Sequence, residues 1–205
     1  MTTDPTGTAS GDRYPGCFSC DEDAALDRLP VRSRIAVDRS WRVVHAVDSA
    51  LPGWLVLVPR RHVTAVADLT DAEAVGLGTW PVRLSRALHA VTGCAKTYVV
   101  QFAEAPGFSH VHVHVVPRAA DLAPEHRGPG VFALLGRPVG EAVPADVQDA
   151  LATALRAALG EPDTGPEPGA QDAAGRGAGR HRNGHSGDAP TAIPELPEHP
   201  TGTAP

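Results

Sequence analysis

The segment Ser109–Pro117 has the sequence SHVHVHVVP and carries the clearest structural signal in the chain. Within it His110, His112 and His114 alternate with valines. Residues two apart on a β-strand share one face, with about 6.6–7 Å between them. The alternation therefore predicts a strand with three imidazoles on one side and valines packed into a core on the other. Three interpretations of the imidazole row follow: a solvent-facing surface, a metal cage, or catalysis at a phosphate.

Other segments of strand length flank this one along the chain. Trp54–Val58 is a continuous apolar run, and a short turn separates it from Trp41–Val47 (WRVVHAV), which has the composition of a strand. Ser33–Arg39 alternates weakly, and Lys96–Ala103 is a further candidate strand. Short turns between such segments are typical of an antiparallel meander. We therefore expect an α+β fold with an antiparallel sheet of about five strands.

Two helices are expected to accompany this sheet. The main helix begins at Thr70, because Thr70 and Glu73 have the spacing of a capping box and apolar residues recur at helical spacing after them. Pro81 lies in the middle of that helix, so we expect a kink or break near Trp80. The second helix is predicted over Pro144–Leu159, since proline suits the first turn of a helix.

Composition divides the 205 residues into four parts. The 21 glycines and 20 prolines are about a fifth of the chain, against a usual share of roughly 12%. All nine aromatic residues lie between Tyr14 and Phe132, which predicts the hydrophobic core there. We expect a flexible leader (1–16), a domain core (17–118), an extension with a helix (119–159) and a disordered tail rich in Gly, Pro and Ala (160–205). The tail has too little apolar surface to offset its ordering entropy.

Charge and hydropathy exclude several classes of protein. The net charge of −6 and the isoelectric point near 5.9 argue against a protein that coats nucleic acid, but not against a small nucleotide ligand. The apolar run Ser49–Pro59 is about half of the ~20 residues that span a bilayer, so no membrane segment is expected. The polar N-terminus has no secretory signal, which makes the cytoplasm the default location.

Two of the three cysteines, Cys17 and Cys20, are spaced as a Cys-x-x-Cys pair. In a chain without an export signal such a pair indicates a metal site or a redox site more than a disulfide framework. The redox interpretation is the weaker one, because no clear helix start follows Cys20.

The triad segment resembles a known family signature. His110-Val-His112-Val-His114-Val-Val matches His-φ-His-φ-His-φ-φ, where φ is apolar, which is the signature of the histidine triad (HIT) superfamily, and Pro117-Arg118 extends the match. Upstream, Leu57–His62 (LVPRRH) is similar to the strand end, basic pair and histidine of that family. Cys17-Phe-Ser-Cys20 is similar to the cysteine pair of its zinc-bearing members. The resemblance covers roughly residues 17–118.

The resemblance implies a nucleotide hydrolase or nucleotidyl transferase that acts on phosphoanhydride or phosphoramidate bonds. The middle histidine of the family attacks the α-phosphate and forms a nucleotidyl-histidine intermediate, which gives that role to His112. Neutral imidazole is a competent nucleophile near pH 7. His114 is expected to donate a hydrogen bond to phosphate oxygens as charge develops. In the family a backbone carbonyl orients the nucleophile's ring, and the sequence does not identify that carbonyl.

The resemblance also implies a metal. In zinc-bearing relatives the first triad histidine is a ligand, together with the cysteine pair and the histidine after the basic pair. The ligands here are then Cys17, Cys20, His62 and His110. Two cysteines and two histidines form a closed tetrahedral set, which suits structural zinc. The alternative is a reduced cysteine pair with both histidines only hydrogen-bonded. Family resemblance further implies a homodimer.

Four more residues are expected to bind the nucleotide. Asp48, at a strand end, resembles the acidic residue that holds the ribose hydroxyls in the family, with an ordinary turn aspartate as the alternative. Gln101 stands in place of an asparagine of the family. Gly107 offers a backbone N–H and Ser109 a hydroxyl, although a strand would turn Ser109 away from the histidines.

The chain also departs from the family pattern. Residues 105–109 (APGFS) replace the Gly-Gln-Ser/Thr that many members carry before the triad, and a histidine common near Trp54 is absent. These changes leave the nucleophile intact and alter the loop beside the phosphates. Two rival functions follow: a regulatory nucleotide-binding protein with little turnover, and a metal-dependent hydrolase that uses the three triad histidines as ligands.

Overall fold

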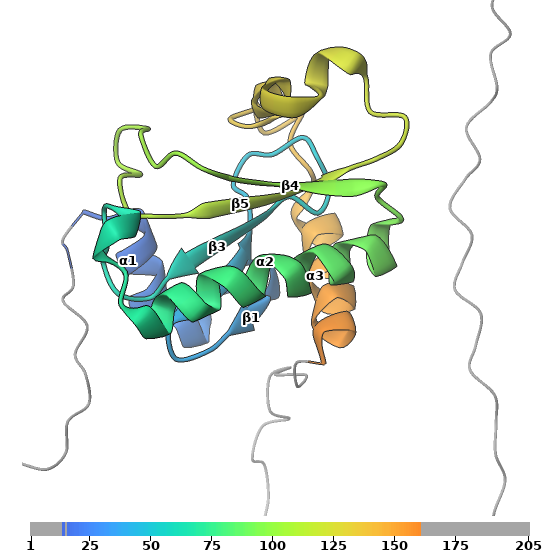
Figure 1. Cartoon of the computed structure of the whole chain (residues 1–205). Coiled ribbons are helices and arrows are strands. Elements are labelled where there is room, and N and C mark those ends of the chain that lie inside the picture. The colour runs from blue at the N-terminus through green and yellow to red at the C-terminus, as the bar shows by residue number, and fades with distance from the viewer. Residues whose placement is uncertain (1–13, 15, 161–205) are drawn as a thin grey trace, which may run out of the picture. The chain divides into compact units, whose positions relative to one another are not determined.

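The computed structural model describes residue 14 and residues 16–160, which build a five-stranded antiparallel sheet in the order β1-β2-β3-β5-β4 (Figure 1). The predicted leader and tail lie almost entirely outside these residues. The α+β class with about five antiparallel strands is confirmed. The strands are β1 (Ala36–Val37), β2 (Trp41–His45), β3 (Leu55–Pro59), β4 (Lys96–Gln101) and β5 (Val113–Arg118).

The β2–β3 hairpin lies inside the sheet and is buried on both faces. All five residues of each strand are buried. The apolar run predicts this for β3, whereas β2 also buries Arg42 and His45. Val43 pairs with Leu57, and both belong to the core beneath α2 together with Leu84. Their neighbour Val44 belongs to a second apolar cluster that includes Val131. The sheet therefore has two packed faces, and the triad strand contributes to both.

Helix α2 (Asp71–Thr92) begins with the predicted capping box. The Glu73 N–H donates to Thr70 Oγ1 (3.3 Å), and the Thr70 N–H donates to Glu73 Oε2 (2.8 Å). A kink or a break was predicted near Trp80. The helix does not break there, because α2 continues through Pro81. Trp80 and Leu84 are buried against the sheet, and this packing outweighs the hydrogen bond that proline removes. No helix in the described ranges is long and apolar enough to cross a membrane.

The second predicted helix is α3 (Ala145–Leu159), with Pro144 at its N-cap. It packs on the same face as α2, where Leu155 joins the core (Figure 1). Arg156 donates to the carbonyls of Arg34 and Ile35, each at 3.0 Å. The helix is thus attached to the chain just before β1 by polar as well as apolar contacts.

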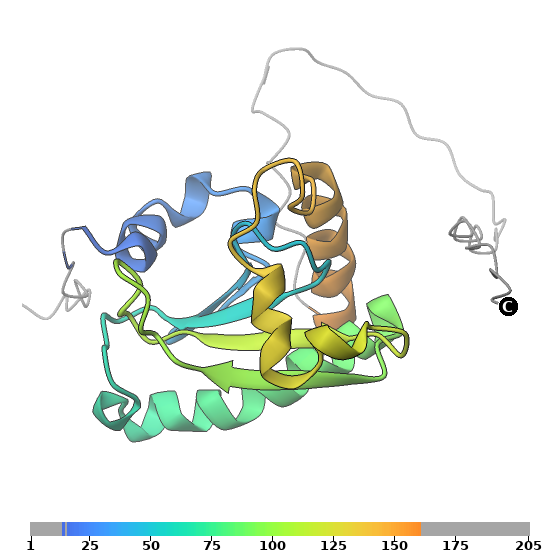
Figure 2. The same ribbon diagram turned by 90° about the horizontal axis from the view of Figure 1, so that it is seen from above.

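The segment between β5 and α3 covers the opposite face of the sheet (Figure 2). It contains two 3-10 helices, η4 (Pro124–His126) and η5 (Gly128–Leu134). Backbone hydrogen bonds join it to the β2–β3 turn: the Ala50 N–H donates to Leu134 O and the Val143 N–H to Ser49 O, both at 2.8 Å. The extension therefore packs over the sheet face on which the third triad histidine lies.

Four predicted strands are shorter than expected: those over residues 41–47 and 96–103 each end two residues early, and two others differ more. The strand expected over residues 33–39 is only β1, because Val31–Ser33 forms a 3-10 turn instead. The triad strand begins at Val113 and not at Ser109, so His110 and His112 lie in the segment that leads into β5. That segment is fixed by other contacts, since the Val111 N–H donates to Val63 O at 2.7 Å.

Candidate active site and metal centre

The three triad histidines lie in two different surroundings. The ring centroids of His112 and His114 are 5.0 Å apart and nearly perpendicular, at 83°. His110 instead faces His62, with 4.9 Å between their ring centroids. The structure thus separates the triad into a pair, His112 and His114, and a member that joins the cysteines.

The ring of His112 is oriented by a backbone carbonyl that sequence reasoning could not identify. His112 Nδ1 lies 2.8 Å from the carbonyl oxygen of His110. A carbonyl oxygen only accepts, so Nδ1 carries the proton and donates it. In the neutral ring Nε2 then holds a free lone pair. This is the arrangement that a nitrogen nucleophile needs.

The ring of His114 is held in the opposite sense. The Trp54 indole Nε1–H donates to His114 Nδ1 at 3.0 Å. An indole nitrogen only donates, so Nδ1 of His114 is the unprotonated nitrogen and Nε2 carries the hydrogen. Burial, followed by the charge of His112, lowers the pKa of His114 to about 4. A neutral ring with an Nε2–H is a hydrogen-bond donor near pH 7.

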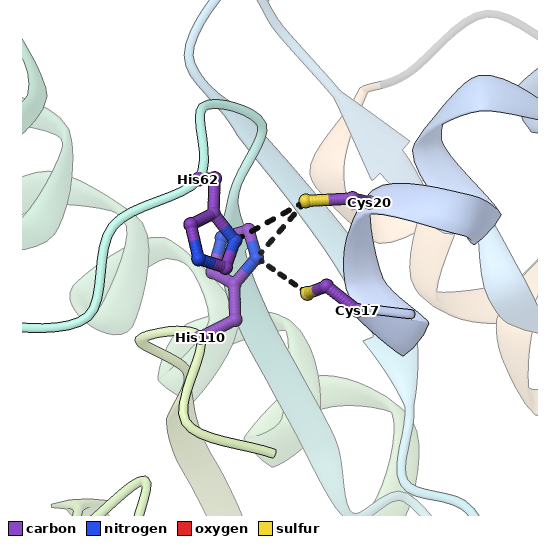
Figure 3. Close-up of side chains that lie close together, drawn as sticks. All are labelled: Cys17, Cys20, His62 and His110. Atoms are coloured by element: carbon purple, nitrogen blue, oxygen red, sulfur yellow. Dashed lines mark hydrogen bonds between the residues drawn. The ribbon is translucent and has the colours of Figure 1, made fainter. Parts of the chain in front are cut away.

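Cys17, Cys20, His62 and His110 form a cluster in which one ligand atom of each residue lies within 4.8 Å of the others (Figure 3). His110 Nδ1 is 3.4 Å from Cys17 Sγ and 3.6 Å from Cys20 Sγ, and His62 Nδ1 is 3.3 Å from Cys20 Sγ. In tetrahedral zinc, with Zn–S near 2.3 Å and Zn–N near 2.0–2.1 Å, sulfur and nitrogen ligands lie about 3.5 Å apart. The cluster therefore fits a zinc site.

His110 has the tautomer that a ligand needs. Its Nε2 lies 2.9 Å from the carbonyl oxygen of Pro59, so Nε2–H donates and Nδ1 faces the thiols with a free lone pair. A carbonyl bonded to the second ring nitrogen is the usual support of a metal-binding histidine. Burial, then the charge of His62, lowers the pKa of His110 to about 4. Burial raises the pKa of the Cys20 thiol.

The cysteine pair lies at a helix start that the sequence did not reveal. Cys17 is the N-cap of α1 (Phe18–Ala24), and Cys20 lies in its first turn. The periodic signal is too short in seven residues to reveal such a helix, which tertiary contacts stabilise instead. Arg42 provides those contacts, because its guanidinium is buried and donates to Glu22 Oε2 (2.9 Å) and to the carbonyl of Ser19 (3.4 Å), both in α1.

The loop that carries His62 is anchored to α2. Arg61 donates to both carboxylate oxygens of Glu73, at 3.1 and 2.7 Å. This ion pair, with hydrogen bonds from Thr70, lowers the pKa of Glu73 to about 2. Tyr14 stacks on the ring of His62, with centroids 4.4 Å apart. His62 is thus held by the ion pair of its neighbour Arg61 and by the stacked ring of Tyr14.

The four predicted nucleotide contacts lie in different places. Gln101 ends β4 and pairs with Val113, next to His112. Gly107 (φ 81°) and Ser109 are exposed in the loop before the triad. Asp48 is exposed in the β2–β3 turn, at the end of β3 remote from Pro59, and among the described residues no hydrogen bond joins its side chain to a triad histidine.

Sequence reasoning missed two residues that contact His114. Trp54 is fully buried, and Phe132 of η5 lies with its ring perpendicular to that of His114, centroids 5.2 Å apart. The apolar run that begins at Trp54 predicts its burial, and a buried indole N–H needs an acceptor. That signal pointed to a polar partner without identifying it. The contact of Phe132 joins residues far apart in the chain and had no local signal.

Comparisons with known proteins find a family model and solved structures similar to this chain. The family model described as "HIT domain" matches residues 32–121. A histidine triad protein from Bradyrhizobium japonicum is 26% identical and covers 66% of this chain and 95% of its own, with a TM-score of 0.52. A Zn-bound histidine triad family protein from Mycobacterium smegmatis has the same fold at 19% identity, over 69% of this chain and 94% of its own, with a TM-score of 0.52. No curated protein matches the chain.

Proposed function

We propose that this protein, whose residues 32–121 match the family model described as "HIT domain", is a nucleotide hydrolase or nucleotidyl transferase. It cleaves a phosphoanhydride or phosphoramidate bond at the α-phosphate through a nucleotidyl-histidine intermediate. The observation that carries the proposal is the pair of opposite tautomers: His112 presents a lone pair at Nε2, and His114 presents a hydrogen at Nε2. A nucleophile and a hydrogen-bond donor then lie side by side.

The reaction takes two steps at His112. Nε2 attacks the α-phosphorus, the P–N bond forms, and the bond to the leaving group breaks with its electrons leaving on that group. The carbonyl of His110 stabilises the positive ring, because it accepts the Nδ1–H. Water or another acceptor then attacks the phosphorus, and the electrons of the P–N bond return to Nε2. The Nε2–H of His114 hydrogen-bonds a phosphate oxygen as charge develops.

The cysteine–histidine cluster would hold zinc without entering this reaction. Its four ligands, Cys17, Cys20, His62 and His110, close a tetrahedral set. When bound, the metal supplies a cross-link between α1, the loop after β3 and the segment before β5. The Zn-bound histidine triad protein from Mycobacterium smegmatis supports this assignment.

We further propose nucleotide contacts, a homodimer and a cytoplasmic location, as expected from the sequence. Asp48, Gln101, Gly107 and Ser109 are candidate contacts to the nucleotide, and the position of Gln101 beside His112 supports its role best. A homodimer through the sheet edge is supported by β4, which has no strand on its outer side among the described residues and carries an exposed Val99. Light scattering of the purified protein tests the dimer. The cytoplasmic location stays a prediction from the sequence.

Removal of the nucleophile tests the reaction. His112→Ala should lower turnover of a nucleotide substrate by several orders of magnitude and leave the melting temperature within a few degrees, because the rest of the site is intact. Wild type incubated with a substrate labelled at the α-phosphate should yield a trapped nucleotidyl adduct that the variant lacks. His89→Ala is the matched control, since His89 is an exposed histidine on α2. His112→Ala activity within tenfold of wild type would refute the role of His112.

The altered loop favours one rival function. Residues 105–109 are exposed and offer Ser109 as the one side-chain hydroxyl before the triad. A regulatory protein that binds nucleotides with little turnover would bind the substrate and give no adduct in the trapping experiment. The other rival, a metal-dependent hydrolase, needs His110, His112 and His114 around one ion. Among the described residues the ligand cluster instead joins His110 to the cysteines.

A further inference from the structure

The buried contact between Trp54 and His114 has a consequence for the reaction. Trp54 is fully buried in the second apolar cluster, and its single polar atom donates to His114 Nδ1 at 3.0 Å. We propose that Trp54 is a positioning residue which fixes His114 as the Nε2–H tautomer, so that the third triad histidine acts as a donor. This inference rests on the proposed function for its catalytic meaning, whereas the tautomer itself can be measured without any substrate.

The hydrogen bond selects the tautomer because only one arrangement satisfies both nitrogens. With Nδ1 unprotonated, the indole N–H has an acceptor. With Nδ1 protonated, two N–H groups face each other at 3.0 Å and the buried indole donor loses its partner. A buried donor without an acceptor is strongly unfavourable, and we expect a preference of at least tenfold for the Nε2–H form. The low pKa of His114 agrees with a ring that stays neutral.

Phe132 also packs against the imidazole of His114. Its ring is perpendicular to His114 (centroids 5.2 Å apart, 90°) and to Trp54 (5.4 Å, 80°). The three rings form a triangle in which each ring contacts the other two. Both aromatic rings therefore pack against the imidazole, which limits its rotation about the Cβ–Cγ bond. Since Phe132 belongs to η5, the extension after β5 is part of the active site and not only a cover for the sheet.

The arrangement divides two roles between two chemically identical side chains. His112 is bound at Nδ1 by an acceptor and His114 by a donor. Exchange of either partner would reverse the ring's function, because a carbonyl imposes a free Nε2 lone pair and an indole imposes an Nε2–H. Trp54 therefore determines the donor role of His114 in the same way as the His110 carbonyl determines the nucleophile role of His112.

Nitrogen NMR tests the tautomer directly. Full-length protein labelled with ¹⁵N should show His114 Nδ1 as an unprotonated nitrogen and Nε2 as a protonated one at neutral pH. A scalar coupling between Trp54 Nε1 and His114 Nδ1 should mark the hydrogen bond. Trp54→Phe keeps an aromatic ring without a donor and should shift both nitrogens toward a mixture of tautomers. Trp80→Phe is the matched control, because Trp80 is buried and donates to Asp38 Oδ2 (2.7 Å) away from the triad.

Turnover provides the second readout. Trp54→Phe should lower kcat about tenfold or more with KM within about threefold, whereas Trp80→Phe should change neither. A protonated Nδ1 in wild type, or an unchanged tautomer in Trp54→Phe, overturns the proposal. An unchanged kcat with a shifted tautomer overturns the catalytic part of it. If wild type has no turnover, the proposed function fails, but the nitrogen NMR spectra still test whether Trp54 fixes the tautomer of His114. If Trp54→Phe does not fold, the wild-type tautomer and coupling decide.

Discussion

Two glycines on helix α2 should respond in opposite directions to the same substitution. Gly76 lies over the indole of Trp41, and a Cβ at this position would overlap the indole nitrogen and lie 2.5 Å from Cδ1. A Cβ at Gly78, two residues further on, would have nothing within 4 Å. Gly76→Ala and Gly78→Ala therefore add the same methyl group to the same helix, once against a buried ring and once in open space.

The expected magnitudes follow from these two surroundings. Alanine in place of a helical glycine stabilises a protein by roughly 0.5–1 kcal/mol, which is the full effect expected at Gly78. At Gly76 the methyl group must displace Trp41, whose side chain is buried and donates to the carbonyl of Glu73 at 3.1 Å. Overpacking costs about 1–3 kcal/mol and the lost hydrogen bond about 1 kcal/mol. The net effect of Gly76→Ala is then a destabilisation of about 1–3 kcal/mol.

Urea denaturation of the two variants and wild type measures this difference. Gly78→Ala should raise the urea concentration at the unfolding midpoint, and Gly76→Ala should lower it. The unfolding free energies of the two variants should differ by about 2–4 kcal/mol. Thermal melts should follow at about 2–4 °C per kcal/mol. Equal stabilisation by both alanines would show that Trp41 does not occupy the space beside Gly76, and would refute the packing of α2 on β2 described above.

Two further predictions concern the metal centre and its surroundings. Cys20→Ser should lose about one zinc per chain by elemental analysis and melt earlier while it retains measurable nucleotidyl transfer, whereas His110→Ala should cost more activity; a metal-free wild type, or a dead Cys20→Ser with an unchanged melt, contradicts this. The pKa of Glu73 falls from 4.5 to about 2 in the folded state, so its stabilisation is present above pH 4.5 and is lost as the pH falls toward 2. That shift corresponds to about 3 kcal/mol of unfolding free energy at most, and because Arg61 is 42% exposed we expect about 1–2 kcal/mol. Glu73→Gln should flatten the stability–pH curve between pH 4.5 and 2. An equal slope in both proteins would exclude the ion pair as the cause of the pH dependence.

Local patterns predicted the elements whose signals are local. The spacing of Thr70 and Glu73 predicted the start of α2, and the strand-like segment 41–47 with the apolar run 54–58 predicted the central hairpin, because capping and strand patterns depend on residues close in sequence. The four ligands of the metal cluster could be named from the family motif. Their assembly is visible only in the fold, since Cys17 and His110 are 93 residues apart.

Features that depend on distant partners could not be predicted in this way. Helix α1 is too short for a periodic signal, and it forms because Arg42 on β2 binds Glu22. The triad strand starts late because Val111 pairs with Val63 and not with β3. The tautomers of His112 and His114 depend on which single atom lies beside each Nδ1. Only the folded chain places a carbonyl beside one and an indole beside the other.

His110 connects the cysteine–histidine cluster to His112, the proposed nucleophile, and this explains why the Cys20 and His110 substitutions should differ. Its side chain faces the thiols, its Nε2–H is bound to Pro59 O, and its own carbonyl orients His112. When Cys20 is replaced, the bond to Pro59 still holds His110, so the carbonyl beside His112 stays in place. When His110 becomes alanine, the carbonyl remains in the chain but both side-chain anchors are lost. In the proposed mechanism, the orientation of His112 Nε2 toward the phosphorus therefore depends on the anchored imidazole of His110 more than on the metal itself.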